Sequence, residues 1–369
     1  MKKFLSLVFF MGILMMSSPF ALAANSVSPA KALVDDGIKL MNTGKTEEAI
    51  LKFNKALIVD NKYVNAYLML GSIYLSKEKY NQALSVYNAA IDIEPSNFIH
   101  YLMRANIYMK IMQTEESEKN ANLAIQDFIK AFGVQDNVSD KYIIHSLVFH
   151  SLSSNDKKSE YWNRSLDYIN RAINLNKKND KAYNLRGIIK LDQEDFESNE
   201  EFQNKQMIFL TAISDFSTAI QCNPRYDDAY YNRGNVYLKL DEYDKAIDDF
   251  TNAIKYEKDS KSDTYGKRAF CYEKNGEHKL AITDYTKAIE KDEKNKVFYN
   301  NRGVIYAKMN EYDLALKDFQ QALKIDAEYE TAQKNIDILQ NHEIKDKSFI
   351  TVQTTGTRFD WERTEKNKK

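Results

Sequence analysis

The chain has 369 residues, enough for one large core or several small stacked units, and its 52 Lys and Arg nearly balance its 53 Asp and Glu. This balance gives no overall field that would attract nucleic acid or an anionic membrane, so neither is expected as a partner. With only 4 prolines and 11 glycines, and abundant Lys, Glu, Asn and Ala, the composition favours helices over sheets.

The first segment has the pattern of an export signal. Two lysines precede the apolar run FLSLVFFMGILMM (4–16), which is too short to span a membrane comfortably. Ala21 and Ala23 then have the small-x-small spacing of a cleavage site. A buried N-terminal helix is the alternative interpretation. We expect a signal peptide over residues 1–23, and no later stretch that could insert stably into a membrane.

Small residues then recur along the chain with spacings of 12 and 7, and an aromatic or bulky residue stands three before the last. Gly234, Ala246, Phe250 and Ala253 show this pattern once, and five of eight units have these spacings. The three middle units keep the pattern with longer centres. The units are predicted at 30–63, 64–97, 98–138, 139–179, 180–226, 227–260, 262–295 and 296–329. The third and fourth are each seven residues longer than the first, and the fifth is longer still.

Each unit contains two stretches with apolar residues at helical spacing, joined by polar turn residues. Small residues let two antiparallel helices approach closely, while the aromatic residue fills the space beside them. One pair cannot bury its apolar face alone, so neighbouring pairs must stack. The stretches AYYNRGNVY (229–237) and KAIDDFTNAI (245–254) closely resemble the two helices of the tetratricopeptide repeat family.

This resemblance covers about residues 30–329 and implies an all-α fold, a right-handed α-solenoid of about eight helix-turn-helix repeats with a concave groove. Residues 330–343 follow the last repeat, and Ala332, Ile336 and Leu339 in them have helical apolar spacing. They are predicted to form a capping helix, because a solenoid needs its terminal face covered for solubility.

Five repeats place Arg before the first small residue and Asp before the aromatic residue of the second helix. The pairs are Arg104 and Asp127, Arg186 and Asp215, Arg233 and Asp249, Arg268 and Asp284, and Arg302 and Asp318. An arginine ladder for phosphate is one hypothesis. Because every Arg comes with its own Asp, we favour salt bridges that fix the register of paired helices. The first repeat reverses the charges (Asp36, Lys52), and the second has apolar Leu70 and Val86.

The family resemblance also implies a ligand groove lined by residues of the first helices. The candidates are Asn184, Tyr231, Asn232, Asn235, Lys267, Phe270, Lys274, Asn300, Asn301 and Lys308. Asn can bond the backbone of an extended peptide, and aromatic rings can cover its apolar side chains. The alternative is that these are ordinary polar residues of an Asn- and Lys-rich chain. A clamp for a C-terminal carboxylate, known in some family members, is not expected, because Ile188 and Asp263 occupy two of its positions.

Two stretches depart from the repeat pattern. The insertion LDQEDFESNEEFQNKQM (191–207) carries six acidic residues before Lys205 and is expected to lengthen the helices of its pair or to loop out. An acidic docking knob or cation site is one hypothesis for it, and a solvated charge run is the favoured one. The C-terminal tail, 344–369, contains the β-prone SFITVQTTGTRFDW (348–361), for which folding back, pairing with a partner strand and disorder all stay open.

The residues that usually carry chemistry form no recognisable site. The five histidines lack metal-ligand spacing, and the chain has no Gly-rich phosphate loop and no nucleophile elbow. Cys222 and Cys271 lie two repeats apart, so two separate buried thiols are expected rather than a disulfide. We therefore predict no enzyme activity, no catalytic residue, no metal site and no cofactor.

The sequence thus favours an exported, non-catalytic scaffold or adaptor that holds a protein or an extended peptide in its groove. The bacterial style of the signal segment favours the periplasm over full secretion. A secreted effector that uses the same groove outside the cell is the second hypothesis. An accessory subunit or glycan binder of cell-wall assembly, using the many tyrosines, is the third. The oligomeric state is not predicted.

Overall fold

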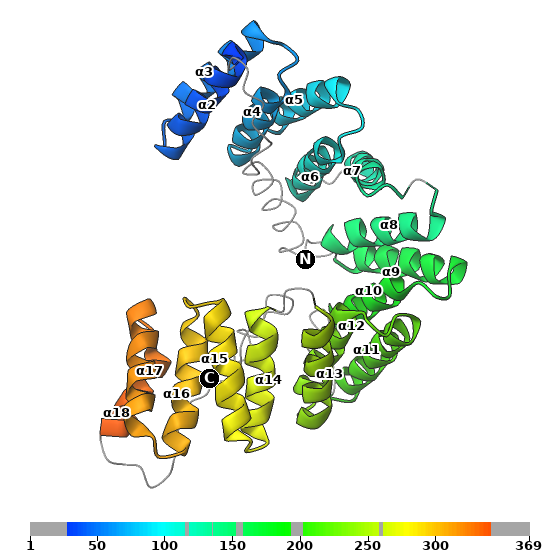
Figure 1. Ribbon diagram of the computed structural model, residues 1–369. Coiled ribbons are helices and arrows are strands. Elements are labelled where there is room, and N and C mark those ends of the chain that lie inside the picture. Colours follow the sequence, from blue (N-terminus) through cyan, green and yellow to red (C-terminus); the bar gives the residue numbers. More distant parts are fainter. Residues whose placement is uncertain are drawn as a thin grey trace. The chain divides into compact units, whose positions relative to one another are not determined.

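The computed structural model describes residues 28–114, 118–134, 136–152, 158–192, 202–257 and 261–340, and all their regular secondary structure is helical (Figure 1). The predicted signal peptide and C-terminal tail lie outside these residues, as does most of the acidic insertion. The helices group into two compact units, here called the N-terminal unit, which ends at Lys177, and the C-terminal unit, which begins at Lys178. The repeat pattern alone does not predict this division.

The N-terminal unit contains four helix pairs. They are α2 (Pro29–Asn42) with α3 (Thr46–Val59), α4 (Val64–Ser76) with α5 (Tyr80–Ile93), α6 (Phe98–Thr114) with α7 (Glu118–Ala131), and α8 (Val138–Leu152) with α9 (Lys158–Leu175). Each first helix packs most extensively on its own second helix, and each second helix also packs on the next first helix. The pairs therefore stack in chain order, as they do in an α-solenoid.

The C-terminal unit contains four more pairs and a last single helix (Figure 1). They are α10 (Asp180–Leu191) with α11 (Phe202–Cys222), α12 (Asp227–Lys239) with α13 (Tyr243–Tyr256), α14 (Ser262–Lys274) with α15 (His278–Lys291), α16 (Lys296–Lys308) with α17 (Tyr312–Ile325), and α18 (Glu330–Gln340). Helix α11 has 21 residues where α13 has 14, so the end of the acidic insertion lengthens this second helix. The all-α prediction is confirmed.

The recurring small residues hold the two helices of a pair together. Ala49, Phe53 and Ala56 on α3 are fully buried, and they pack in one cluster against α2. A Cβ atom built on Gly37 of α2 would lie 2.4 Å from the Phe53 ring. The first helix must therefore present no side chain at that point, because the aromatic ring of the second helix already fills the space.

The turn inside each regular pair uses one residue in the left-handed conformation. Its φ lies between 56° and 77° at Gly44, Glu78, Asp241, Gly276 and Asn310. The chain then bonds back to the helix it has left; for example, the N–H of Glu242 donates to the carbonyl of Tyr237 at 2.9 Å. This left-handed cap satisfies the last carbonyls of the first helix and starts the second helix in the antiparallel direction.

The fourth pair closes with serines in place of Gly and Ala. Ser146 and Ser165 are both fully buried, and each hydroxyl donates at 2.9 Å to the other residue's carbonyl. The hydroxyls themselves are 3.0 Å apart. A serine is small enough for the two helices to approach closely. Because each serine hydroxyl donates to a carbonyl of the facing helix, serine in place of Gly or Ala leaves no unpaired polar group here.

Helix α18 covers the face of the last pair. Ala332 and Ile336 are buried against α16 and α17, and Leu339 is half-buried. Asp337 stands where each repeat has its first small residue, and it is exposed and accepts a bond from Gln333 at 2.9 Å. The outer face of α18 is therefore polar. None of the helices in the described ranges is long and apolar enough to cross a membrane.

Candidate functional site

The Arg–Asp pairs lie where the first and second helices of a repeat meet. In all five, Arg Nε and Nη2 donate to the two carboxylate oxygens of the paired Asp, at 2.6 to 3.0 Å. The Asp side chains are 4 to 7% exposed. Such two-point contacts fix direction as well as distance, so each pair sets the register of its two helices.

The arginines also reach the preceding repeat. Arg233 Nη1 donates to Ser217 Oγ at 2.9 Å, and Arg268 and Arg302 donate in the same way to Thr251 and Thr286 at 3.0 Å. Arg104 Nη1 reaches the Asn88 amide oxygen at 2.6 Å. Each of these four guanidinium groups therefore joins three helices, two of its own repeat and the second helix of the repeat before.

Tyrosines flank the same guanidinium groups. Arg233 lies 5.8 and 5.9 Å from the ring centres of Tyr230 and Tyr237, three residues before and four after it on one helix face. Arg268 and Arg302 each have two tyrosines at the same offsets, Tyr265 with Tyr272 and Tyr299 with Tyr306. These arginines are enclosed by carboxylate, hydroxyl and rings, which favours the structural role over a phosphate site.

The other repeats make the same contact with different chemistry. Lys52 Nζ lies 3.4 Å from Asp36 Oδ2 in the first repeat, with the charges reversed. In the second, Leu70 and Val86 pack in one apolar cluster. In the fourth, the rings of His145 and Tyr168 lie 4.9 Å apart. Sequence reasoning missed this last pair because neither residue signals a partner by its charge.

The ten candidate groove residues are mostly covered. Seven are buried, namely Asn184, Asn232, Asn235, Lys267, Phe270, Asn300 and Asn301. Tyr231 and Lys308 are half-buried, and Lys274 is exposed with its ammonium group 5.0 Å from the Phe270 ring centre. The structure brings the buried polar residues together in three hydrogen-bonded groups along the first helices of the C-terminal unit, and they do not stand free on an open surface.

The first group joins α10 and α12. The amide of Asn232 donates to Asn184 Oδ1 at 2.9 Å, and the amide of Asn184 donates to the Tyr226 hydroxyl at 3.3 Å. The carbonyl oxygen of Asn232 is buried and accepts no hydrogen bond. A buried acceptor without a donor is rare in folded proteins and calls for a physical explanation.

The second group joins α12 and α14. Lys267 Nζ donates to Asn235 Oδ1 at 2.7 Å, lies 3.6 Å from Asp263 Oδ2, and lies over the Tyr231 ring. The Tyr231 hydroxyl donates to the same carboxylate oxygen. Burial opposes the charge on Lys267, but the carboxylate beside it raises the lysine pKa above its ordinary value. The Asn235 amide nitrogen is buried and has no acceptor.

The third group joins α15, α16 and α18. Asn335 on α18 donates to Asn300 Oδ1 at 2.9 Å, and Asn300 donates to Asn301 Oδ1 at 3.1 Å. Asn301 in turn donates to the Tyr285 hydroxyl at 3.2 Å. Sequence reasoning missed Asn335, although it follows Asn301 by 34 residues, the length of one repeat.

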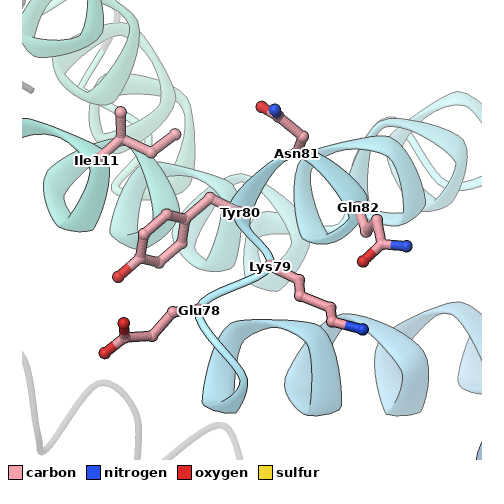
Figure 2. A pocket seen from close by; sticks show the side chains of 6 residues that line it. All are labelled: Glu78, Lys79, Tyr80, Asn81, Gln82 and Ile111. Carbon is pink, nitrogen blue, oxygen red and sulfur yellow. The ribbon is translucent and has the colours of Figure 1, made fainter.

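A separate open pocket of about 440 Å³ lies in the N-terminal unit (Figure 2). It is lined by Glu78, Lys79, Tyr80, Asn81, Gln82 and Ile111. Figure 2 shows these side chains at the α4–α5 turn, at the start of α5 and on α6. Apart from Tyr80 and Ile111 they are exposed, and none offers a buried, unpartnered polar atom, so the pocket has no feature that would select a ligand.

The described residues offer no metal cluster of three or more His, Cys, Asp or Glu. The two cysteines are not bonded to each other: Cys271 is buried, and Cys222 is half-buried. Burial raises the pKa of the Cys271 thiol to about 12, so it stays protonated and unreactive at neutral pH.

Comparison with known families agrees with the repeat geometry. The tetratricopeptide repeat profile matches residues 227–260 and 297–329, and two related repeat profiles match 71–111 and 262–295. The chain is a tetratricopeptide repeat protein.

This repeat protein is 26% identical over 204 residues to Tetratricopeptide repeat protein 6 of Homo sapiens, a match that covers 50% of this chain and 37% of the human one. It is 24% identical over 230 residues to Protein O-mannosyl-transferase TMTC1 of Homo sapiens, covering 62% and 23%. The chain therefore spans well under half the length of both relatives. It is also similar to the crystal structure of a tetratricopeptide repeat protein from Parabacteroides merdae, with a TM-score of 0.36 and 18% identity, over 85% of this chain and 99% of that one.

Proposed function

We propose that this protein is a non-catalytic scaffold that binds a protein segment in extended form along the first helices of its C-terminal unit. The observation that carries the proposal is the pair of unused hydrogen-bonding groups on α12. The Asn232 carbonyl oxygen lacks a donor, and the Asn235 amide nitrogen lacks an acceptor. The two residues lie on one face, one turn apart.

A peptide backbone supplies what these two groups lack. Each peptide unit of an extended segment offers one N–H and one C=O, which match an unused acceptor and an unused donor. Other polar atoms of the site are already bonded, so the ligand would gain hydrogen bonds without breaking the Asn184–Asn232 contact. The flanking Tyr231 and Phe270 rings would cover apolar side chains of the segment.

To reach Asn232 and Asn235, the ligand must displace the side chains that now cover them. Lys267 and Tyr231 close it through Asn235 and Asp263. Replacing Tyr231 by Phe removes the bond to Asp263 and keeps the ring, so this variant should bind more readily, whereas Asn232→Ala removes the acceptor and should bind less well.

Capture of the tagged mature chain after crosslinking in cells that produce it tests the proposal. We expect a protein partner whose yield falls in Asn232→Ala and not in the control Asn252→Ala, whose half-buried side chain lies on α13 and donates only to the Asp248 carbonyl of its own helix. Thermal unfolding of both variants shows whether the fold is intact. Equal capture by the folded Asn232→Ala variant would refute a site on α12.

We also propose that the chain is exported to the bacterial envelope, with the periplasm as its compartment. The support is the apolar run and small-residue spacing at the start of the chain. Fractionation of producing cells tests this proposal independently of the groove. Periplasmic recovery of a chain that begins at Ala24 is the expected result, and recovery from the medium alone would favour a secreted effector.

A further inference from the structure

The turn between α14 and α15 contains the only Asn–Gly dipeptide in the sequence, Asn275–Gly276. Both residues are exposed, and Gly276 is left-handed, with a φ of 77°. No heavy atom beyond its chain neighbours lies within 4 Å of a Cβ built on Gly276. Because glycine has no side chain to block the approach, its backbone nitrogen can reach the side-chain amide of the preceding asparagine more easily than that of any other residue.

The side chain of Asn275 joins two repeats. Its amide nitrogen donates at 2.6 Å to Oδ1 of Asp244, which lies in the first turn of α13 in the preceding repeat. The junction between the first and second repeats has the same contact, because Lys77, which directly follows α4, pairs there with Glu47 in the first turn of α3. A donor on the later repeat therefore meets a carboxylate on the earlier one at both junctions.

We propose that Asn275–Gly276 is a site of spontaneous deamidation, which turns the contact between the sixth and seventh repeats from attractive to repulsive. The Gly276 nitrogen, after it loses its proton to a solvent base, attacks Asn275 Cγ. The bond from Cγ to the amide nitrogen breaks, and that nitrogen takes up a proton and leaves as ammonia. The product is a five-membered succinimide. Water then opens the ring at one of its two carbonyls and leaves aspartate or isoaspartate at this position.

The folded turn restrains this reaction. The Gly276 N–H donates to the Glu273 carbonyl at 3.0 Å, and Asp244 holds the Asn275 amide. Asn275 itself has helical dihedral angles, with φ −79° and ψ −2°. Both hydrogen bonds must open before the nitrogen can reach Cγ, so the reaction proceeds from the locally open turn and its rate follows the frequency of opening. The product accumulates as an irreversible record of those openings.

The converted residue weakens the packing of α13 on α14 in three ways. It replaces a donor to Asp244 by a carboxylate, and like charges in contact repel. It places an anion at the C-terminus of α14, where the helix dipole disfavours negative charge. Isoaspartate also adds one methylene to the backbone just before Gly276, whose left-handed conformation starts α15. All three effects lower the stability of the converted chain.

Incubation of the purified chain at mildly alkaline pH, followed by peptide mass spectrometry, tests the proposal. We expect Asn275 to be converted to aspartate and isoaspartate, and Asp244→Asn to speed the conversion because it weakens the hold on the amide. Gly276→Asn should slow it many-fold, since a side chain then shields the nitrogen. Asn310 occupies the same left-handed position in the last repeat, so this variant should fold, as thermal unfolding can verify.

Two variants at Asn275 test the consequence for stability. Asn275→Asp copies one product and should lower the melting temperature by a few degrees. Its matched control is Asn275→Lys, which installs the residue of the second repeat, keeps a donor toward Asp244 and cannot deamidate, so its melting temperature should not fall. Equal melting temperatures for the two variants would contradict the change from attraction to repulsion.

The chemistry itself has two outcomes that would overturn the proposal. One is a folded chain that keeps Asn275 intact while the urea-unfolded chain converts it under otherwise equal conditions. The other is equal conversion in Gly276→Asn and in the unsubstituted chain, because the reaction would then not depend on the exposed glycine nitrogen.

Discussion

The N-terminal and C-terminal units use the same helix pairs but lock them differently. In the C-terminal unit all four repeats contain a bidentate Arg–Asp pair. In the N-terminal unit the same two positions hold a reversed ion pair, an apolar contact, an Arg–Asp pair and a His–Tyr contact. The lesson is that the repeat demands a contact at this point, while the chemistry of the contact is free.

The first helices show the second difference between the units. The C-terminal unit buries a row of Asn side chains with Lys267 along them, bonded from helix to helix. The corresponding helices of the N-terminal unit are mainly apolar inside, with Leu68, Leu70 and Ile107 buried there. Each buried polar group needs a hydrogen-bond partner, so fewer substitutions should be tolerated on the first helices of the C-terminal unit than on those of the N-terminal unit.

Breaking one Arg–Asp pair should have the largest effect on stability. Asp249→Ala leaves the mostly buried Arg233 guanidinium without its carboxylate, and we expect the free energy of unfolding to fall by about 3 kcal/mol. Urea unfolding followed by circular dichroism measures this loss. The C-terminal unit should unfold first, because Arg233 also holds α12 against α11.

The double variant Arg233→Leu, Asp249→Val tests whether an apolar contact can replace the ion pair at these two positions. It installs the side chains of the second repeat and removes both charges, so it should cost about 1 kcal/mol or less. A double variant as unstable as Asp249→Ala would show that the C-terminal unit requires the ion pair itself, and the comparison between the units would fail.

Gly71 of the N-terminal unit and Gly234 of the C-terminal unit should differ in their tolerance of a methyl group. A Cβ on Gly71 would lie 2.5 Å from the Tyr87 ring, whereas the nearest ring atom to a Cβ on Gly234 is Phe250 Cε1 at 3.0 Å. Gly71→Ala should therefore destabilise the protein by about 2 kcal/mol, and Gly234→Ala by clearly less. Melting temperatures of the two single variants decide this, and equal losses would contradict the packing difference.

The buried tyrosines of the two units should respond oppositely to loss of the hydroxyl. The Tyr87 hydroxyl in the N-terminal unit has no hydrogen-bond partner, while the Tyr285 hydroxyl in the C-terminal unit accepts from Asn301. Tyr87→Phe should leave stability unchanged or raise it, and Tyr285→Phe should lower it by about 1 kcal/mol. Urea unfolding of both variants provides the measurement, and the same sign for both would argue against it.

The smallest expected effect is a pH dependence confined to the N-terminal unit. Burial lowers the pKa of His100 below 6.5, although Glu94 Oε2 lies 3.6 Å away and opposes the shift. The folded state therefore favours the neutral ring, so the stabilisation is present above pH 6.5 and is lost as the pH falls below it. His100→Gln should flatten this part of the stability profile. An unchanged profile in the variant would assign the dependence to other groups.

The sequence predicts the repeats well because their signal lies in residue size. The spacing of Gly234, Ala246 and Ala253 is a packing requirement, and the Arg–Asp contacts follow from residues that occur only together. The burial of Asn232 and Asn301 could not be predicted, because a polar residue on a helix does not reveal whether a neighbour covers it. Nor could the contact of His145 with Tyr168, which carries no charge pattern.

Helix α18 limits how this architecture can grow. Asp337 occupies the position at which the first helix of each repeat has a small residue facing its second helix. A second helix therefore could not pack closely on α18 as it does in the other repeats. A repeat gained by gene duplication would keep the cap only if it were inserted before Glu330, between α17 and α18. Growth of the array is therefore expected by insertion of repeats ahead of α18 and not beyond it.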